Sequence, residues 1–131
     1  MRTLTQLFHC FMIYLYKGVI AMAKCVYQVQ GDFQHICDKI KKEIIEGSFS
    51  ASIEDEEYLE VDGTKIGIIV FERYSYTGKN RLSLSVTIIE NNQQVKVIGM
   101  SSGGSQGMIF KINTFGENAF LDKLNEIMER L

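Results

Sequence analysis

Residues 82–88 are Leu82-Ser83-Leu84-Ser85-Val86-Thr87-Ile88, a stretch in which large apolar side chains alternate strictly with serine and threonine. Alternation with a period of two residues predicts a β-strand that buries one face and exposes the other. An antiparallel sheet with one face on the core and the other in water produces this pattern. The stretch therefore indicates an antiparallel sheet that is covered on one side.

Further strands are predicted along the chain by the same alternation and by turn residues. They cover residues 25–30, 49–53, 66–71, 95–100 and 108–112, and the turns fall at Asp62-Gly63, Thr77 to Asn80 and Asn91-Asn92. The strand at 66–71 is apolar on both faces, which predicts a central position in the sheet. The acidic residues in 54–62 are predicted to form a solvated hairpin face that discourages edge pairing.

Two helices are predicted, one after the first strand and one at the C-terminus. Asp32 is placed as an N-cap, and apolar residues follow at helical spacing up to Gly47, which ends the helix. Residues 114–117 form a T-x-x-E capping box that opens the second helix. Its apolar stripe consists of Phe120, Leu121, Leu124, Ile127, Met128 and Leu131.

Together these elements predict the α+β class, with a single antiparallel sheet of about five to six strands and two helices on one face. The order along the chain is a strand, a helix, about four to five strands and a second helix, or β-α-β(4-5)-α. This topology is similar to that of the helix-grip and TATA-binding-protein-like folds, in which a curved sheet wraps a long C-terminal helix. The likeness concerns topology and carries no function.

The composition indicates one domain without nucleic-acid character. The chain has 131 residues, 46% of them hydrophobic, and a formal net charge of −2. This length suits a single domain with its own core, and because no basic face is evident, a nucleic-acid partner is not expected. The three cysteines (Cys10, Cys25 and Cys37) are few and odd in number, which argues against a disulfide framework. We therefore expect free thiols, a reducing compartment and a cytoplasmic protein.

Residues 1–21 are expected to be a leader outside the native domain, which then spans residues 22–131 and begins at Met22. The leader contains an apolar block interrupted by His9 and followed by Lys17. Three explanations compete: a secretory signal, a membrane anchor and a start codon assigned upstream of the true one. The interruptions and the short apolar run favour the third, in which case no membrane contact is expected. Residues 1–23 are then predicted to pack loosely on the domain.

The segment Ser101-Ser102-Gly103-Gly104-Ser105-Gln106-Gly107 departs from strand and helix composition. Residues 103–107 match the G-x-S-x-G pattern of serine hydrolases, but a strand is predicted to follow and no histidine occurs after His35, so the match is accidental. Two interpretations remain. The glycines form an irregular crossing between strands, or the backbone approaches a ligand or partner, with Ser102, Ser105 and Gln106 as donors.

The candidate binding residues are Ser102, Gly103, Gly104, Ser105, Gln106 and Gly107, together with Arg73 and Tyr74. Arg73 and Tyr74 either line a pocket mouth or cap the sheet with amphipathic side chains. His35 and Cys37, at i and i+2 on a helix, point to different sides and form no dyad. Because no nucleophile, base and acid form a set, no catalytic residue, metal site or cofactor is predicted.

Three short motifs carry a resemblance to a known family. They are Ser101-Ser102-Gly103-Gly104, Gly107-Met108-Ile109-Phe110-Lys111-Ile112-Asn113, and Gly116-Glu117 at the start of the last helix. On these motifs, residues 22–131 resemble a small bacterial family catalogued as a domain of unknown function. Because that family has no assigned activity, the resemblance implies no catalytic or binding residue.

Two functional hypotheses follow, and an enzyme is ranked after both. In the first, the protein is a small non-enzymatic domain that binds a small ligand or a protein partner between its sheet and its terminal helix. A cavity lined by Phe49, Ile66, Val70, Leu84 and Phe120 would support the small-ligand form, and a solid core there would exclude it. In the second, the protein forms a homodimer through the Ser/Thr-rich face of its sheet or through an edge strand.

Overall fold

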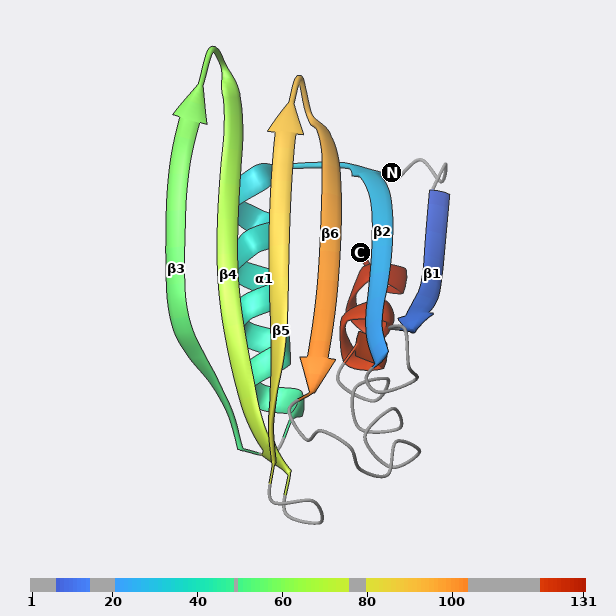
Figure 1. The fold of residues 1–131 in the computed structure, drawn as a ribbon. Helices are drawn as coiled ribbons and strands as arrows, with labels where there is room; N and C mark the ends of the chain where they lie inside the picture. Colours follow the sequence, from blue (N-terminus) through green and yellow to red (C-terminus); the bar gives the residue numbers. More distant parts are fainter. Residues whose placement is uncertain (1–6, 15–20, 49, 76–79, 104–120) are drawn as a thin grey trace.

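The computed structural model describes residues 7–14, 21–48, 50–75, 80–103 and 121–131, and Figure 1 shows the elements they form. In chain order these are β1 (Leu7–Tyr14), β2 (Ala21–Gln30), α1 (Phe33–Gly47), β3 (Ala51–Val61), β4 (Thr64–Ser75), β5 (Asn80–Asn91) and β6 (Gln94–Gly103). A C-terminal helix follows at residues 121–129. The predicted strand at residues 108–112 and the capping box at residues 114–117 lie outside the described residues.

The six strands form one antiparallel sheet with the order β1-β2-β6-β5-β4-β3. β3 to β6 are a meander of hairpins, and α1 carries the chain from β2 to β3. Figure 1 shows both helices on the same side of the sheet, with α1 behind β4 and β5 and the C-terminal helix behind β2. The predicted α+β class, with one antiparallel sheet and two helices on one face, is confirmed.

β1 differs from the loose packing that the composition of residues 1–23 predicts. Its eight residues pair with β2 in antiparallel register, from Leu7 opposite Gln28 to Tyr14 opposite Ala21. Without β1, the outer edge of β2 would present unpaired N–H and C=O groups, and an adjacent apolar, β-prone stretch satisfies them. The prediction of loose packing is therefore wrong for Leu7–Tyr14.

The core lies between the sheet and the two helices. From the sheet its buried side chains are Cys25, Tyr27, Ile69, Phe71, Leu82, Leu84, Val86, Ile88, Val95 and Val97, and from the helices Phe33, Ile36, Cys37, Ile40, Ile44, Leu121, Leu124, Ile127 and Met128. Every apolar residue of the stretch 82–88 belongs to this set, as the alternation predicts. The helices thus cover the apolar face of β5, and the serine and threonine side chains lie on the other face.

Local signals place the ends of several elements. Asp32 caps α1, because its side chain accepts a hydrogen bond of 2.9 Å from the backbone N–H three residues on. The β3–β4 turn has positive φ at Asp62 (49°) and Gly63 (81°), the geometry of a two-residue hairpin of type I′. The β5–β6 turn has positive φ at Asn92 and Gln93, so it lies one residue later than predicted.

The acidic segment belongs to the edge strand β3, whose side chains from Glu54 to Val61 are all exposed. The predicted solvated acidic face is thereby confirmed. The register of β3 against β4 shifts between Ile53 and Asp55, so Glu54 is an extra residue. Because of this bulge, Ile53 packs against the core while Asp55 pairs with Val70 on the opposite face.

Candidate interaction surface

The uncovered face of the sheet is assembled in rows by the strand register. Residues paired across neighbouring strands point to the same face, so each row can be followed from β3 to β2. Four rows result: Leu59, Ile66, Ile89, Lys96 and Gln28; Glu57, Ile68, Thr87, Ile98 and Val26; Asp55, Val70, Ser85, Met100 and Lys24; Ser52, Glu72, Ser83 and Ser102. We call this set the open face.

Apolar side chains on the open face flank a strip of small ones. On β4, Ile68 is 36% exposed, and on β6, Met100 is 43% exposed, while Ser85 and Thr87 of β5 lie between the two strands. Leu59 on the edge strand β3 is also exposed. In the described part of the chain no helix lies over these residues (Figure 1). The open face is therefore an apolar platform with a shallow centre along β5.

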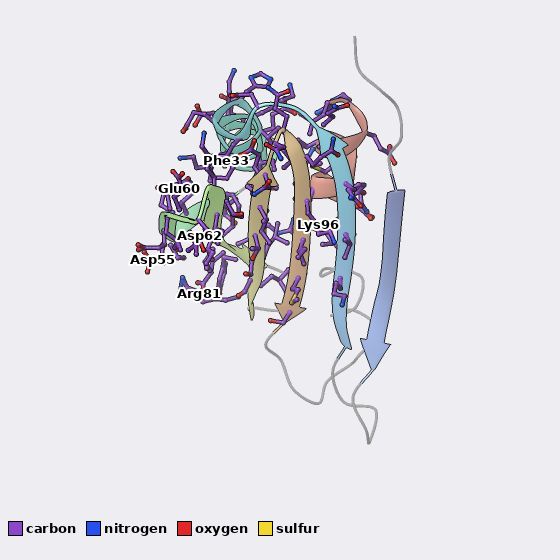
Figure 2. All side chains as sticks on the ribbon, turned by 90° about the horizontal axis from the view of Figure 1, so that it is seen from above. Phe33, Asp55, Glu60, Asp62, Arg81 and Lys96 are labelled. Carbon is purple, nitrogen blue, oxygen red and sulfur yellow. The ribbon has the colours of Figure 1, made fainter. Side chains whose placement is uncertain are left out.

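Charges on the open face are separated by sign. Asp55 and Glu57 lie on β3, whereas Lys24 and Lys96 lie on β2 and β6. Figure 2 shows Asp55 at the β3 edge of the sheet and Lys96 farther across it, toward β2. Arg81 and Glu72 form an ion pair of 2.8 Å, so these two opposite charges compensate each other. The open face thus has an acidic side and a basic side.

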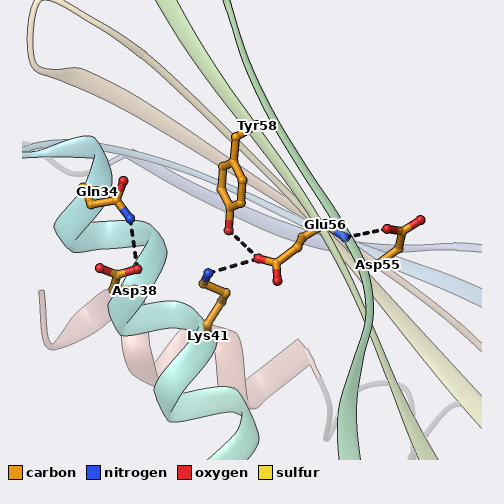
Figure 3. A network of polar contacts seen from close by, with 6 residues as sticks. All are labelled: Gln34, Asp38, Lys41, Asp55, Glu56 and Tyr58. Atoms are coloured by element: carbon orange, nitrogen blue, oxygen red, sulfur yellow. Dashed lines mark hydrogen bonds and ion pairs between the residues drawn. The ribbon is translucent and has the colours of Figure 1, made fainter.

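On the covered face, a polar network fastens α1 to β3 (Figure 3). The Lys41 ammonium lies 3.0 Å from the Glu56 carboxylate, and the Tyr58 hydroxyl donates a 2.8 Å hydrogen bond to the same oxygen. Hydrogen bonds with Tyr58 and Lys41 lower the pKa of Glu56, and the partners Tyr58 and Glu56 raise the pKa of Lys41. Figure 3 shows Glu56 directed toward α1 and Asp55 directed away from it.

The C-terminal helix packs directly on β2 and β6. The Cys25 thiol donates a 3.0 Å hydrogen bond to the Asn125 side-chain oxygen, and the Tyr27 hydroxyl donates to the same atom. At Gly99 a Cβ would lie 2.5 Å from a Leu124 methyl carbon. There is consequently no room for a ligand between β6 and this helix at Gly99.

The structure separates the sequence-predicted site residues rather than gathering them. Arg73 shares a row with Leu82 and Gly103 on the covered face, and burial lowers the pKa of its guanidinium. The adjacent Tyr74, 44% exposed, lies on the open side with Ser102. Gly104, Ser105, Gln106 and Gly107 lie outside the described residues.

Of the five residues predicted to line one cavity, the three that the structure describes do not share one face of the sheet. Leu84 is fully buried under the helices, whereas Ile66 and Val70 are on the open face. Phe49 and Phe120 lie outside the described residues. Side chains that alternate across a sheet cannot line one cavity, so the predicted set is wrong for the three residues that the structure describes.

Other potential sites on the described residues are limited. A polar surface recess of about 250 Å³ lies between the two helices and is lined by Lys42, Glu43, Glu46, Gly47, Lys123 and Arg130. Glu43 forms ion pairs with both Lys39 and Arg130. Within the described segments no three His, Cys, Asp or Glu side chains cluster in a way that could hold a metal ion. Nor does any helix there have the length and apolar character to cross a membrane.

The burial of the thiols bears on their chemistry. Cys25 and Cys37 are both buried thiols. Burial raises the pKa of Cys37 to about 11. Since the thiolate is the reactive form, Cys37 is a core residue, and its position in the apolar stripe of α1 agrees with this.

Comparison with known proteins gives a family. Residues 22–131 match the family of unknown function DUF6054. The chain belongs to this family. The match covers β2 to β6, α1 and the C-terminal helix, so the described part of the DUF6054 domain has five strands and two helices, and Leu7–Tyr14 lies outside the match. The predicted membership of a family of unknown function is confirmed, whereas bacterial origin and the helix-grip likeness stay predictions.

The other comparisons concern the fold of this DUF6054 chain. The curated protein sequences contain no match to it. Among solved structures it is similar to PA94, a protein of unknown function from Pseudomonas aeruginosa, with a TM-score of 0.57 and 9% sequence identity. The similarity covers 74% of this chain and 69% of that one. At this identity the likeness concerns the fold alone.

Proposed function

We propose that this DUF6054 protein is a non-enzymatic domain that binds a protein partner on the open face of its sheet. One observation carries the proposal: Ile68 with Val70 on β4, and Ile98 with Met100 on β6, form two apolar ridges on either side of small side chains of β5, and Ile68 and Met100 are exposed. Contiguous exposed apolar surface with a polar rim marks interaction sites. The separated charges at β3 and at β2 and β6 supply such a rim.

Two observations favour a protein partner over the other hypotheses. The contact between Gly99 and Leu124 argues against a small ligand held between the sheet and the terminal helix. The buried, weakly acidic thiol of Cys37 is a poor nucleophile, which argues against an enzyme that uses it. The buried thiols fit a reducing compartment, so a cytoplasmic location belongs to the proposal.

Two of the sequence-predicted binding residues fit the proposed surface. Ser102 and Tyr74 lie at its end, where β6 finishes and β4 approaches its turn. Arg73 points to the covered side and is not part of it, and Gly103 shares the row of Arg73. In this proposal the glycines of β6 permit close approach of backbone or side chains, as the position of Leu124 over Gly99 illustrates.

Site-specific photo-cross-linking in the cells that make the protein tests the proposal. A benzophenone amino acid replaces Thr87, at the centre of the open face, and in a matched control it replaces Gln34, which is exposed on α1. The expected result is a discrete adduct from the probe at position 87 and none from the probe at position 34. The mass of the adduct, relative to the 15.0 kDa chain, gives the size of the partner.

Either of two results would contradict the proposal. The first is the absence of any protein adduct from position 87 while the probe is intact. The second is the same set of adducts from both positions, because a partner that contacts α1 equally is not held by the open face.

A further inference from the structure

We propose that a second copy of this chain docks on the open face, with the two-fold axis of the dimer along β5. The inference rests on the proposed function and names its partner. Most homodimers are isologous, meaning that the same patch on each copy meets itself. The open face must then be complementary to its own image after a half-turn, and three features of the face meet this condition.

The first feature is shape along the axis. A half-turn about β5 places the small side chains of Ser83, Ser85 and Thr87 against the same residues of the partner subunit. The sheets of face-packed β-proteins are about 10 Å apart, with interdigitating side chains. Small residues on the axis let the larger neighbours on β4 and β6 reach across that space.

The second feature is the apolar pairing on either side of the axis. The half-turn exchanges β4 with β6, which flank β5 in the sheet order. Ile68 shares a row with Ile98, so it comes to lie over the partner subunit's Ile98. Val70 shares a row with Met100 and lies over the partner subunit's Met100. The four side chains of each copy form two apolar ridges that meet across the interface.

The third feature is charge. The half-turn exchanges β3 with β2, so Asp55 lies over the partner subunit's Lys24, which occupies the same row. Lys96 lies on the basic side, one row from that of Glu57. An axis perpendicular to the strands would set β3 against β3 and oppose acid to acid, which costs binding energy. The charges therefore select the axis along β5.

The size of the face suits a dimer of this kind. Five strands at about 4.8 Å and four rows that span about seven residues at about 3.3 Å give a plan of roughly 20 by 20 Å. Even with its corrugation, a face of this plan offers less than the roughly 800 Å² that each partner contributes to a standard interface, which is typical of a weak dimer. We therefore expect a dimer that forms reversibly with concentration.

Sedimentation velocity of the full 131-residue chain, from low micromolar to millimolar concentration, tests the inference. We expect a monomer at the low end and a dimer at the high end. Ser85→Arg places two cations at the two-fold axis and should raise the dissociation constant of the dimer about tenfold. The matched control Gln34→Arg, on the exposed side of α1, should leave it unchanged. Circular dichroism checks that both variants are folded.

A charge swap tests the orientation of the copies. Lys24→Asp and Asp55→Lys each create two like-charge contacts, so each variant alone should dimerise about tenfold more weakly. Mixing the two variants should restore association, because every introduced charge then faces an opposite one. The two positions are four strands apart within one chain, so an intrachain contact cannot produce the rescue.

Each other outcome overturns the inference, and two of them separate it from the proposed function. Suppose that the chain is a monomer at every concentration and that the probe at position 87 gives an adduct whose mass differs from that of a dimer of this chain. This result rejects self-association but keeps the proposal that the open face binds a protein. A monomer without any adduct rejects both. A dimer that is indifferent to Ser85→Arg, or variants that are not rescued by mixing, assigns the contact to another surface or axis. If the side chains of the open face are shielded from solvent even in the dilute monomer, the cover comes from the same chain, and the inference is wrong.

Discussion

At the scale of single residues, Asn125 connects the C-terminal helix to the sheet. Its side-chain oxygen accepts hydrogen bonds from the Cys25 thiol and the Tyr27 hydroxyl. Tyr27 is 1% exposed and Cys25 is fully buried, so each donor needs a protein partner. Both donors lie on β2 and share one face, as the predicted alternation requires.

Removing one of these donors should cost stability. Tyr27→Phe keeps the packing of the ring but deletes the hydrogen bond, and we expect a loss of about 1 kcal/mol in the free energy of unfolding. Urea denaturation measures it. The comparison is Tyr58→Phe, which deletes a hydrogen bond to Glu56 from a residue that is 38% exposed, and this exposed bond should contribute less than about 0.5 kcal/mol. Equal losses for the two variants would contradict the role assigned to Asn125.

The ion pair between α1 and β3 predicts a dependence of stability on pH. The pKa of Glu56 is lower in the folded protein than its ordinary value, because Tyr58 and Lys41 donate to its carboxylate. Its contribution is therefore present above the ordinary pKa of glutamate and is lost as the pH falls through the lower, folded pKa.

Glu56→Gln tests this assignment. The amide oxygen still accepts from Tyr58 but carries no charge for Lys41. We expect the variant to be less stable than the wild type near neutral pH, and the difference to vanish as the pH falls through the lowered, folded-state pKa of Glu56. Urea midpoints across this range measure it. A difference that stays constant at all pH values would show that charge is not the cause.

At the scale of elements, Gly99 sets the distance between β6 and the C-terminal helix. A Cβ there would be 2.5 Å from a Leu124 methyl carbon, closer than atoms in real structures approach. Leu124 is fully buried, so it has little freedom to move aside. The glycine in β6 is thus explained by close packing of the helix rather than by its backbone angles.

Gly99→Ala should therefore destabilise the fold by about 1–3 kcal/mol through overpacking. Leu124→Val removes the atom in conflict, so the double variant should recover part of the loss, with a coupling of about 1 kcal/mol. Denaturant unfolding of the four proteins of the cycle measures both quantities. Additive effects of the two substitutions would contradict direct contact between these residues.

Periodicity is sufficient to predict several elements from sequence, and its limits are visible in two others. The alternation in residues 82–88 and the helical stripe that includes Ile36 and Ile40 correspond to β5 and α1. β3 continues through the acidic residues 54–61, because backbone pairing with β4 stabilises a strand whose side chains have no core to fill. Leu7–Tyr14 becomes β1 because the edge of β2 is adjacent in space, which composition does not encode.

The open face could be predicted only in part. The serine and threonine side chains of β5 indicate one polar face, but β4 is apolar on both faces, and sequence gives no means of assigning Ile68 to one or the other. The register against β5 decides, since Ile68 pairs with Thr87 and Ile69 with Val86. The separated charges have the same origin, because β2 and β3 are distant in the sheet although both flank α1 in sequence.

At the scale of the whole molecule, the two faces of one sheet have different roles. One face and two helices form the core, which supplies the stability of the domain. The other face has apolar side chains on β4 and β6, small polar ones between them on β5, acid on β3 and base on β2 and β6. In the proposed function the binding surface belongs to the same sheet that carries the core, so it is ordered before binding, and a preordered surface loses little entropy when it binds.

The most direct measurement of the central claim is the oxidation rate of Met100 by peroxide, followed by mass spectrometry at the natural concentration of the protein in its cell extract. Met100 is 43% exposed on the open face. A methionine introduced by Gln34→Met, on the exposed side of α1, serves as the reference. We predict that Met100 is oxidised several-fold more slowly in the extract than in dilute purified protein, while the reference is unchanged. Equal rates for Met100 in the two samples would contradict the claim that the open face binds protein.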